Sequence, residues 1–215
     1  MKQTPYLFLL PCILILAFTS IYPICYSIYY SFFNWRWGNE KDFIGLSNYF
    51  NLLTDKEFWI IIKNTFVFAF FACLFEIIIG VLLAIYIDRI KFGSTIIRTL
   101  LLIPLMVSGI SVTMLFKVIL DNMFGIIPYF LSFFGIKSNF FGSYDAAMPT
   151  IIGLDVWWQT SFVFIIILAG LKSIPNEPIE AAKMDGATEW DITRYIRLPM
   201  IRSLLFLVLI FRSID

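Results

Sequence analysis

The sequence predicts an all-α membrane protein, a polytopic helix bundle with four complete spans and part of a fifth. Two observations support this prediction. Hydrophobic residues make up 60% of the 215-residue chain and charged residues only 14%, whereas soluble domains average about 45–50% apolar and about 25% charged residues. Apolar runs also recur along the chain, and four of them reach the ~20 residues that a helix needs to cross the hydrocarbon core of a bilayer.

The four complete runs comprise residues 6–33, 65–87, 99–120 and 149–171. The first could be a signal peptide, but it is longer than the usual apolar core of about 7–15 residues, and no small-x-small cleavage site follows it. We therefore predict an uncleaved span. Pro11 and Pro23 inside it predict kinks, which membrane helices tolerate when neighbouring groups satisfy the freed carbonyls.

A fifth run opens at Ser203 with the letters SLLFLVLIF. Arg212 and Asp215 follow it one turn apart, a spacing at which the two side chains can pair. A chain terminus here would place a free carboxylate in hydrocarbon, which is costly. We therefore expect the natural protein to continue and to complete this span. On this view residues 1–215 form a single transmembrane domain that is incomplete at its C-terminus.

A charged segment separates the fourth and fifth runs. This segment, EAAKMDGATEWDITRYIRLP at residues 180–199, contains four acidic and three basic side chains in a largely hydrophobic chain. Asn176 is the predicted N-cap of a first helix, since its side chain can accept a backbone N–H. Gly186 is predicted to end that helix, because glycine adopts the left-handed conformation without steric cost.

A second short helix is predicted to start at Thr188, with Asp191 three residues on in a capping-box pattern, and to stop at Pro199. Acids at its start and bases at its end match the helix dipole. The connection 172–202 is therefore predicted to be a compact helix–turn–helix. Two interpretations stay open: a knob that docks on another protein, or an amphipathic helix that lies on the membrane surface.

Charge and composition set the orientation and exclude several kinds of partner. Lys and Arg favour the side of the membrane that holds the N-terminus and the connection 172–202, so the positive-inside rule places both in the cytoplasm. A net charge of +1 with no basic tract argues against nucleic acid. Histidine is absent and Cys12, Cys25 and Cys73 lie in apolar runs, so we predict no metal site and no catalytic residue.

Polar side chains inside the spans are candidates for a solute path, because a charge at the bilayer centre costs about 2.5–3.5 kcal/mol on insertion scales. The candidates are Glu76, Ser108, Ser111, Asp155, Trp157, Trp158 and Gln159. The group at 155–159 combines aromatic faces with hydrogen-bonding groups, which suits a sugar, although Trp is also common at membrane interfaces. Glu76 also fits an interhelical hydrogen bond, and the two serines also fit plain helix contacts.

The charged segment resembles the EAA loop of ABC-importer permeases. The loop's pattern, EAA-x3-G-x9-I-x-LP, is matched at every fixed position by Glu180-Ala181-Ala182, Gly186, Ile196 and Leu198-Pro199. Other stretches, among them RTLLLIPLMVSGISVTMLFKVILDNMFGIIPYFL, are similar to the sugar-type permeases of the maltose and glycerol-3-phosphate branch. The resemblance covers the whole chain and breaks off within the fifth of the six spans usual in that family.

The resemblance implies a type I ABC-importer permease, the membrane subunit of an ATP-driven, binding-protein-dependent importer for a sugar or a related carbohydrate. It implies no enzymatic activity, and no phosphate-binding loop of the GxxxxGK[ST] type occurs in the chain. The alternatives are a permease for a non-sugar solute, such as a polyamine or an inorganic anion, and more remotely a membrane-embedded enzyme. We expect a multi-pass protein of the inner or plasma membrane.

The resemblance also implies partners and coupling residues. The partners would be a cytoplasmic ABC ATPase dimer, a second homologous permease, an extracytoplasmic substrate-binding protein and membrane lipid, but no nucleic acid. This chain would bind no cofactor, and ATP with Mg²⁺ would sit on the ATPase. The residues that would couple it to the ATPase are Glu180, Ala181, Ala182, Asp185, Gly186, Ala187, Ile196, Leu198 and Pro199.

Overall fold

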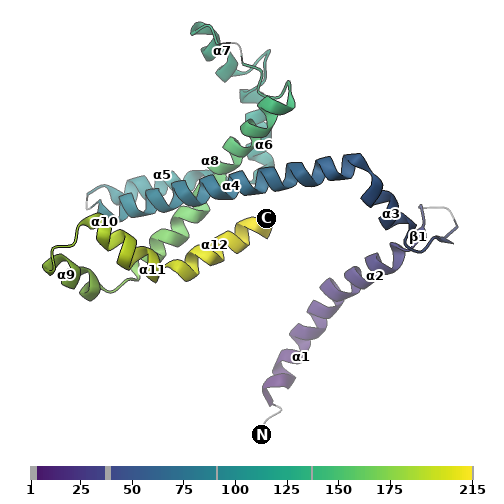
Figure 1. Ribbon diagram of the computed structural model, residues 1–215, viewed down its shortest axis with the longest axis horizontal. Helices are drawn as coiled ribbons and strands as arrows, with labels where there is room; N and C mark the ends of the chain where they lie inside the picture. The colour runs from purple at the N-terminus through teal and green to yellow at the C-terminus, as the bar shows by residue number, and fades with distance from the viewer. Residues whose placement is uncertain (1–3, 37–39, 91, 137, 215) are drawn as a thin grey trace. The chain divides into compact units, whose positions relative to one another are not determined.

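The structure is a computed structural model that describes residues 4–36, 40–90, 92–136 and 138–214, and it is built almost entirely of helices (Figure 1). The chain divides into two compact units, Met1–Asn64 and Thr65–Asp215. The predicted all-α class is therefore confirmed. The single-domain organisation expected from the sequence stays a prediction.

The first apolar run forms helix α1 (Thr4–Leu16), a π-helical turn η1 (Ala17–Ile21) and helix α2 (Tyr22–Tyr30). Together they contain a stretch long and apolar enough to cross a membrane. Proline has no N–H to donate to the carbonyl four residues before it, and the π turn lies just before Pro23. Helix α1 continues through Pro11, so the irregular backbone lies only near Pro23 in this run, and the predicted kinks stay predictions.

The rest of the first unit is a short hairpin followed by a helix. Strands β1 (Phe33–Asn34) and β2 (Asp42–Phe43) pair antiparallel, with Phe33 opposite Phe43. Their rings meet edge to face with centroids 5.3 Å apart, a favoured aromatic geometry. Helix α3 (Ser47–Thr54) follows, and helix α4 begins at Lys56.

Two long helices supply much of the second unit, and the first of them begins in the first unit. Helix α4 (Lys56–Arg89) has 34 residues and helix α8 (Tyr144–Lys172) has 29, and both are long and apolar enough to span a bilayer. They contain the second and fourth apolar runs, so these two predicted spans are confirmed as helices. Between them lie α5 (Ser94–Met106), α6 (Gly109–Ile119) and the short α7 (Ile126–Phe133).

The third apolar run is not one straight helix, as the sequence had suggested. It forms α5 and α6, which meet at an angle of 91°. Val107 and Ser108 adopt extended backbone at the break, just after Pro104 inside α5. Helix α8 accommodates the break: Trp158 Nε1 donates to the Val107 carbonyl at 3.2 Å. Irregular backbone at membrane depth is tolerated where protein satisfies its polar groups in this way.

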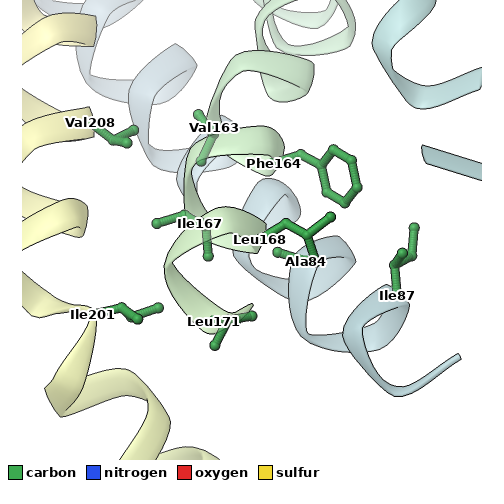
Figure 2. Packing of buried hydrophobic residues seen from close by; sticks show 9 residues of the cluster. All are labelled: Ala84, Ile87, Val163, Phe164, Ile167, Leu168, Leu171, Ile201 and Val208. Carbon is green, nitrogen blue, oxygen red and sulfur yellow. The ribbon is translucent and has the colours of Figure 1, made fainter. Parts of the chain in front are cut away.

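The hydrophobic core gathers around α8. Figure 2 shows Phe164 and Leu168 of α8 on the side of α4, while Val163 and Ile167 lie toward Val208 of α12 (Arg202–Ile214). In lipid, helices associate through close packing more than through hydrophobic burial, so small residues at the contact matter. Gly80 and the buried Ala84 give α4 a small-xxx-small pair against α8.

Helix α12 contains the fifth apolar run and packs on α8. A Cβ added at Gly170 would lie 2.4 Å from Leu204 Cδ1, so this glycine allows α12 to approach closely. The described part of this helix has 13 residues. Asp215, the expected partner of Arg212, lies outside the described residues.

Candidate functional site

The charged segment forms four short helical pieces, which we call the knob (residues 176–200). They are α9 (Asn176–Met184), α10 (Glu189–Ile192), the π-helical turn η2 (Thr193–Arg197) and α11 (Leu198–Met200). Their outline is visible in Figure 1 beside the start of α12. The predicted helix–turn–helix is therefore present, with additional helical turns before α12.

Gly186 makes the turn between the two halves of the knob. Its φ of +81° lies in the left-handed region, where residues with a Cβ are strained. The Gly186 N–H donates to the Lys183 carbonyl at 3.1 Å and the Ala187 N–H to the Ala182 carbonyl at 2.9 Å. These two bonds form a Schellman motif, which satisfies the last carbonyls of α9. The predicted role of Gly186 as helix terminator is confirmed.

The second half of the knob begins with a complete capping box. The Asp191 N–H donates to Thr188 Oγ1 at 3.2 Å, and the Thr188 N–H donates to Asp191 Oδ2 at 3.0 Å. The hydrogen bonds from the Thr188 hydroxyl and backbone hold the pKa of Asp191 below its ordinary value. The predicted cap at Thr188 is confirmed, and the turn is fixed on both sides of Gly186.

Two expectations about the ends of the knob are wrong. Asn176 is the first residue of α9 rather than its N-cap, because Pro175 occupies the cap position in extended conformation. Pro199 does not halt the second helix either. It lies in the first turn of α11, directly after the π turn η2, and the helix continues through it to Met200.

The residues expected to contact an ATPase lie mostly at the surface of the knob. Glu180, Ala181, Asp185, Gly186 and Pro199 are exposed, whereas Ala182, Ala187, Ile196 and Leu198 are half-buried. Large side chains surround them: Met184 is 89% exposed, Trp190 65% and Tyr195 66%. The surface of the knob therefore contains both small residues and large apolar side chains. Sequence reasoning had named only the small residues as contacts for another protein.

An ion-pair cluster centred on Glu189 holds the knob together. Its carboxylate lies 3.2 Å from Lys183 Nζ, 3.4 Å from Arg197 Nη1 and 3.9 Å from Arg89 Nη2. Burial raises the pKa of Glu189, but the hydrogen bond from Lys183 and the charges of Arg197 and Arg89 outweigh it, so its pKa lies below the ordinary value. Sequence reasoning gave Glu189 and Arg197 only a helix-dipole role and missed this cluster.

A second polar cluster lies inside the helix bundle. Arg212 of α12 donates from Nε to Glu76 Oε2 at 2.6 Å and from Nη2 to Asp155 Oδ2 at 2.9 Å. Glu76 of α4 is fully buried, and the side chain of Asp155 of α8 is partly buried, with 18% exposed. The cluster thus joins three helices. The signal was visible in the sequence, because charges inside apolar spans usually pair with one another, but the sequence did not say which helices meet.

Two cavities open beside this cluster. One of about 460 Å³ has Asp155, Trp158, Thr113 and Lys117 in its wall, and one of about 360 Å³ has Asp155, Trp158, Arg212 and Gln159. Three residues proposed for a solute path, Asp155, Trp158 and Gln159, are thereby brought together. Such mixed walls of aromatic and hydrogen-bonding groups are typical of small-molecule sites.

The other candidates for the path have different surroundings. Trp157 turns to another face of α8, where its ring meets Phe116 edge to face with centroids 5.2 Å apart. Ser108 caps α6: it accepts the Ser111 N–H at 3.3 Å, and the two hydroxyls lie 2.8 Å apart. Glu76 is fully buried beneath Arg212, which fits the interhelical bond considered for it.

Comparison with known proteins agrees with this architecture. Residues 76–215 match the family described as the inner membrane component of binding-protein-dependent transport systems. The chain belongs to this family. It is thus a permease of the inner membrane, a multi-pass transporter subunit rather than an enzyme.

Relatives cover nearly the whole chain. The permease is 33% identical over 96% of its length to a probable ABC transporter permease of Sinorhizobium fredii, 68% of which is covered. It is 31% identical over 98% of its length to a trehalose/maltose transport system permease of Thermococcus litoralis, 72% of which is covered. Membership of the ABC-importer permease family, which the EAA pattern had suggested, is confirmed.

Solved structures share the fold of the permease. A bacterial ABC transporter involved in import of the acidic polysaccharide alginate matches with a TM-score of 0.82 at 25% identity, over 97% of this chain and 71% of that chain. The same transporter in complex with a pentasaccharide-bound periplasmic protein matches with a TM-score of 0.83, over 97% and 70%. The expected fold, a membrane helix bundle of the ABC-importer type, is confirmed.

Proposed function

We propose that this permease imports a carbohydrate and that the knob couples it to a cytoplasmic ATPase. Two lines of support meet here. Two of the proteins named above are described as a permease of a trehalose/maltose transport system and as a transporter involved in the import of alginate, and the EAA pattern coincides with a rigid surface structure. The observation that carries the coupling role is the left-handed turn at Gly186 between two capped helices.

A coupling element must transmit movement without absorbing it. An ATPase shifts the permease between conformations only if its own state favours one of them, which requires a firm mechanical connection. The Schellman motif and the capping box fix the turn from both sides. Beside it, Ala181 and Ala182 allow close approach, and the exposed Met184 offers apolar contact. These features support docking on a protein over lying flat on lipid.

The proposed coupling role of the knob also sets the orientation of the permease in the membrane. The knob and the N-terminus lie in the cytoplasm, where the ATPase dimer resides, in agreement with the positive-inside bias of the Lys and Arg residues. An extracytoplasmic binding protein then delivers solute to the opposite side, and a second homologous permease completes the pathway. ATP and Mg²⁺ belong to the ATPase subunits, and this chain binds no cofactor of its own.

The solute path runs past Asp155, Trp158 and Gln159. An indole face and nearby carboxylate and amide groups offer a sugar both stacking and hydrogen bonds, and these groups line the two cavities described above. Arg212, itself in the wall of the second cavity, donates to Asp155 and to the buried Glu76. This assignment names a carbohydrate class rather than one sugar.

The experiment that tests coupling changes the turn. Gly186→Val places a β-branched residue at a φ of +81°, where no neighbour lies within 4 Å of the added Cβ, so only backbone strain is introduced. We expect loss of uptake with normal insertion in the membrane. Gly186→Asn is the matched control, since Asn tolerates the left-handed region, and Gly135→Val tests equal strain at φ +72° outside the knob.

Normal uptake by the Gly186→Val variant would contradict the coupling role. The partner is tested separately with a photo-cross-linker at Ala182 in the assembled transporter. Capture of the ATPase subunit supports docking, whereas capture of lipid alone supports the surface-helix interpretation. Competition between maltodextrin and a polyamine for the partner binding protein then separates the carbohydrate from the non-sugar alternative.

A further inference from the structure

Arg89 connects the knob to the end of α4. It is the last residue of that helix, and its Nη2 donates to Thr193 Oγ1 at 2.9 Å and to the Glu189 carbonyl at 3.4 Å. The same nitrogen lies 3.9 Å from the Glu189 carboxylate. One nitrogen, Nη2, therefore makes all three contacts, with the backbone and with side chains of the second half of the knob.

Contacts within the knob position the groups of Glu189 and Thr193 that Arg89 contacts. Thr193 is only 2% exposed, and its hydroxyl donates to the Glu189 carbonyl at 2.8 Å. Arg197, with its side chain 10% exposed, lies against the Glu189 carboxylate. A guanidinium is well suited to such a site, because its planar fork offers several donors in a fixed geometry.

The π turn η2 explains how Glu189 and Arg197 come to face each other. Eight residues of regular α-helix rotate by about 800°, which leaves the two side chains about 80° apart. A π turn accommodates one extra residue, so the rotation falls to about 700° and the side chains point within about 20° of one another. The Leu198 N–H donates to the Thr193 carbonyl across this turn. The irregular turn therefore brings Arg197 onto the face that meets Arg89.

We propose that Glu189, Arg89, Thr193 and Arg197 form a joint that transmits movement of the knob to α4. This proposal rests on the coupling role proposed above and adds the route by which movement enters the bundle. Along the chain the knob is connected to α8 at one end and to α12 at the other, but not to α4. Leu198 of the knob packs against the core cluster that includes Ala84 and Ile87 of α4, and the joint adds a polar link from the knob to the end of that helix. Arg89 and Glu189 are thus positioning residues for coupling.

The first test measures solute taken up per ATP hydrolysed by the complete transporter in proteoliposomes. Arg89→Gln and Glu189→Gln should each lower this ratio by about three- to tenfold, the range expected for charge-assisted contacts that are part exposed. ATP hydrolysis itself and the amount of assembled complex should stay unchanged. Lys172→Gln, an exposed cation at the end of α8 and outside the knob, is the control and should keep the ratio.

The second test replaces the ionic joint by a covalent one. In a background with Cys12, Cys25 and Cys73 changed to Ala, Arg89→Cys combined with Glu189→Cys should uncouple the transporter. A short bifunctional maleimide should then restore the ratio in the same preparation, because both positions are accessible at the surface. If the two residues were needed only for folding, cross-linking after assembly would not restore the ratio.

The outcomes separate this proposal from the proposed function. Loss of coupling in both Gln variants, followed by rescue on cross-linking, supports the joint. An unchanged ratio in the Gln variants, or no rescue on cross-linking, overturns it while Gly186→Val still abolishes uptake. If Gly186→Val also transports normally, the knob does not couple at all, and the proposed function fails together with the joint.

Discussion

Arg212 of α12 donates two hydrogen bonds to Glu76 of α4, with Nε 2.6 Å from Oε2 and Nη2 2.9 Å from Oε1. The Glu76 side chain is fully buried and that of Arg212 is 6% exposed. A bidentate pair of this kind combines strength with fixed geometry. It joins the second apolar run to the fifth, which are more than a hundred residues apart in the sequence.

Arg212→Met should destabilise the permease strongly. Removal of one partner from a buried pair leaves an uncompensated charge, which costs about 3–5 kcal/mol, and here both Glu76 and Asp155 would lose their cation. The free energy of unfolding in mixed micelles measures the effect. Arg202→Met is the control, because Arg202 is exposed at the other end of the same helix. Equal stability of the two variants would contradict the prediction.

Gly80→Ala should destabilise the contact between α4 and α8. The added Cβ would lie 2.7 Å from both Cβ and Cγ1 of Val163 and 3.3 Å from the Phe164 nitrogen, and a branched side chain and a backbone atom cannot easily yield. Overpacking of this kind typically costs about 1–3 kcal/mol. Gly153→Ala on α8, where nothing lies within 4 Å, should instead be neutral or slightly stabilising. Thermal unfolding of the two variants should therefore shift in opposite directions or clearly differ in size.

Trp158→Phe should loosen the break between α5 and α6. The change keeps an aromatic ring but removes the indole N–H that donates to the partly buried Val107 carbonyl. Loss of a partner by such an acceptor costs at most the ~1–3 kcal/mol of a fully buried one. Hydrogen exchange of the Ser111 and Val112 amides, which donate to Ser108, should become faster. Trp157→Phe, whose ring only packs against Phe116, provides the comparison and should leave these amides protected.

The Glu189 cluster should give the knob a pH dependence confined to acidic pH. A carboxylate whose pKa is lowered in the folded state stabilises that state above its ordinary pKa and loses this effect as pH falls through the lowered value. Protection of the α10 amides, corrected for intrinsic exchange, should be constant from about pH 8 to about pH 5 and fall below about pH 4, given an ordinary Glu pKa of about 4.3. Glu189→Gln should abolish the part of this fall that is due to Glu189. A fall centred near pH 6 would contradict the assignment.

The sequence by itself determined the helical class and the construction of the knob. Apolar runs of spanning length are a direct consequence of lipid as solvent, and they fixed the positions of α4 and α8. The turn at Gly186 and the cap at Thr188 were predictable because each depends on residues a few positions apart. The EAA pattern identified the family, since its fixed residues lie within one local structure.

Only the tertiary structure decided which distant groups meet. Arg212 might have paired along its own helix, but the packing of α12 on α8 places it between Glu76 and Asp155. The 91° bend after α5 is stabilised by a hydrogen bond from Trp158, fifty-one residues further along the chain. The contact of Arg197 with Glu189 depends on the π turn, and that of Arg89 with Glu189 depends on the end of another helix. Local patterns specify turns and caps, whereas the pairing of charges across helices depends on how whole helices pack.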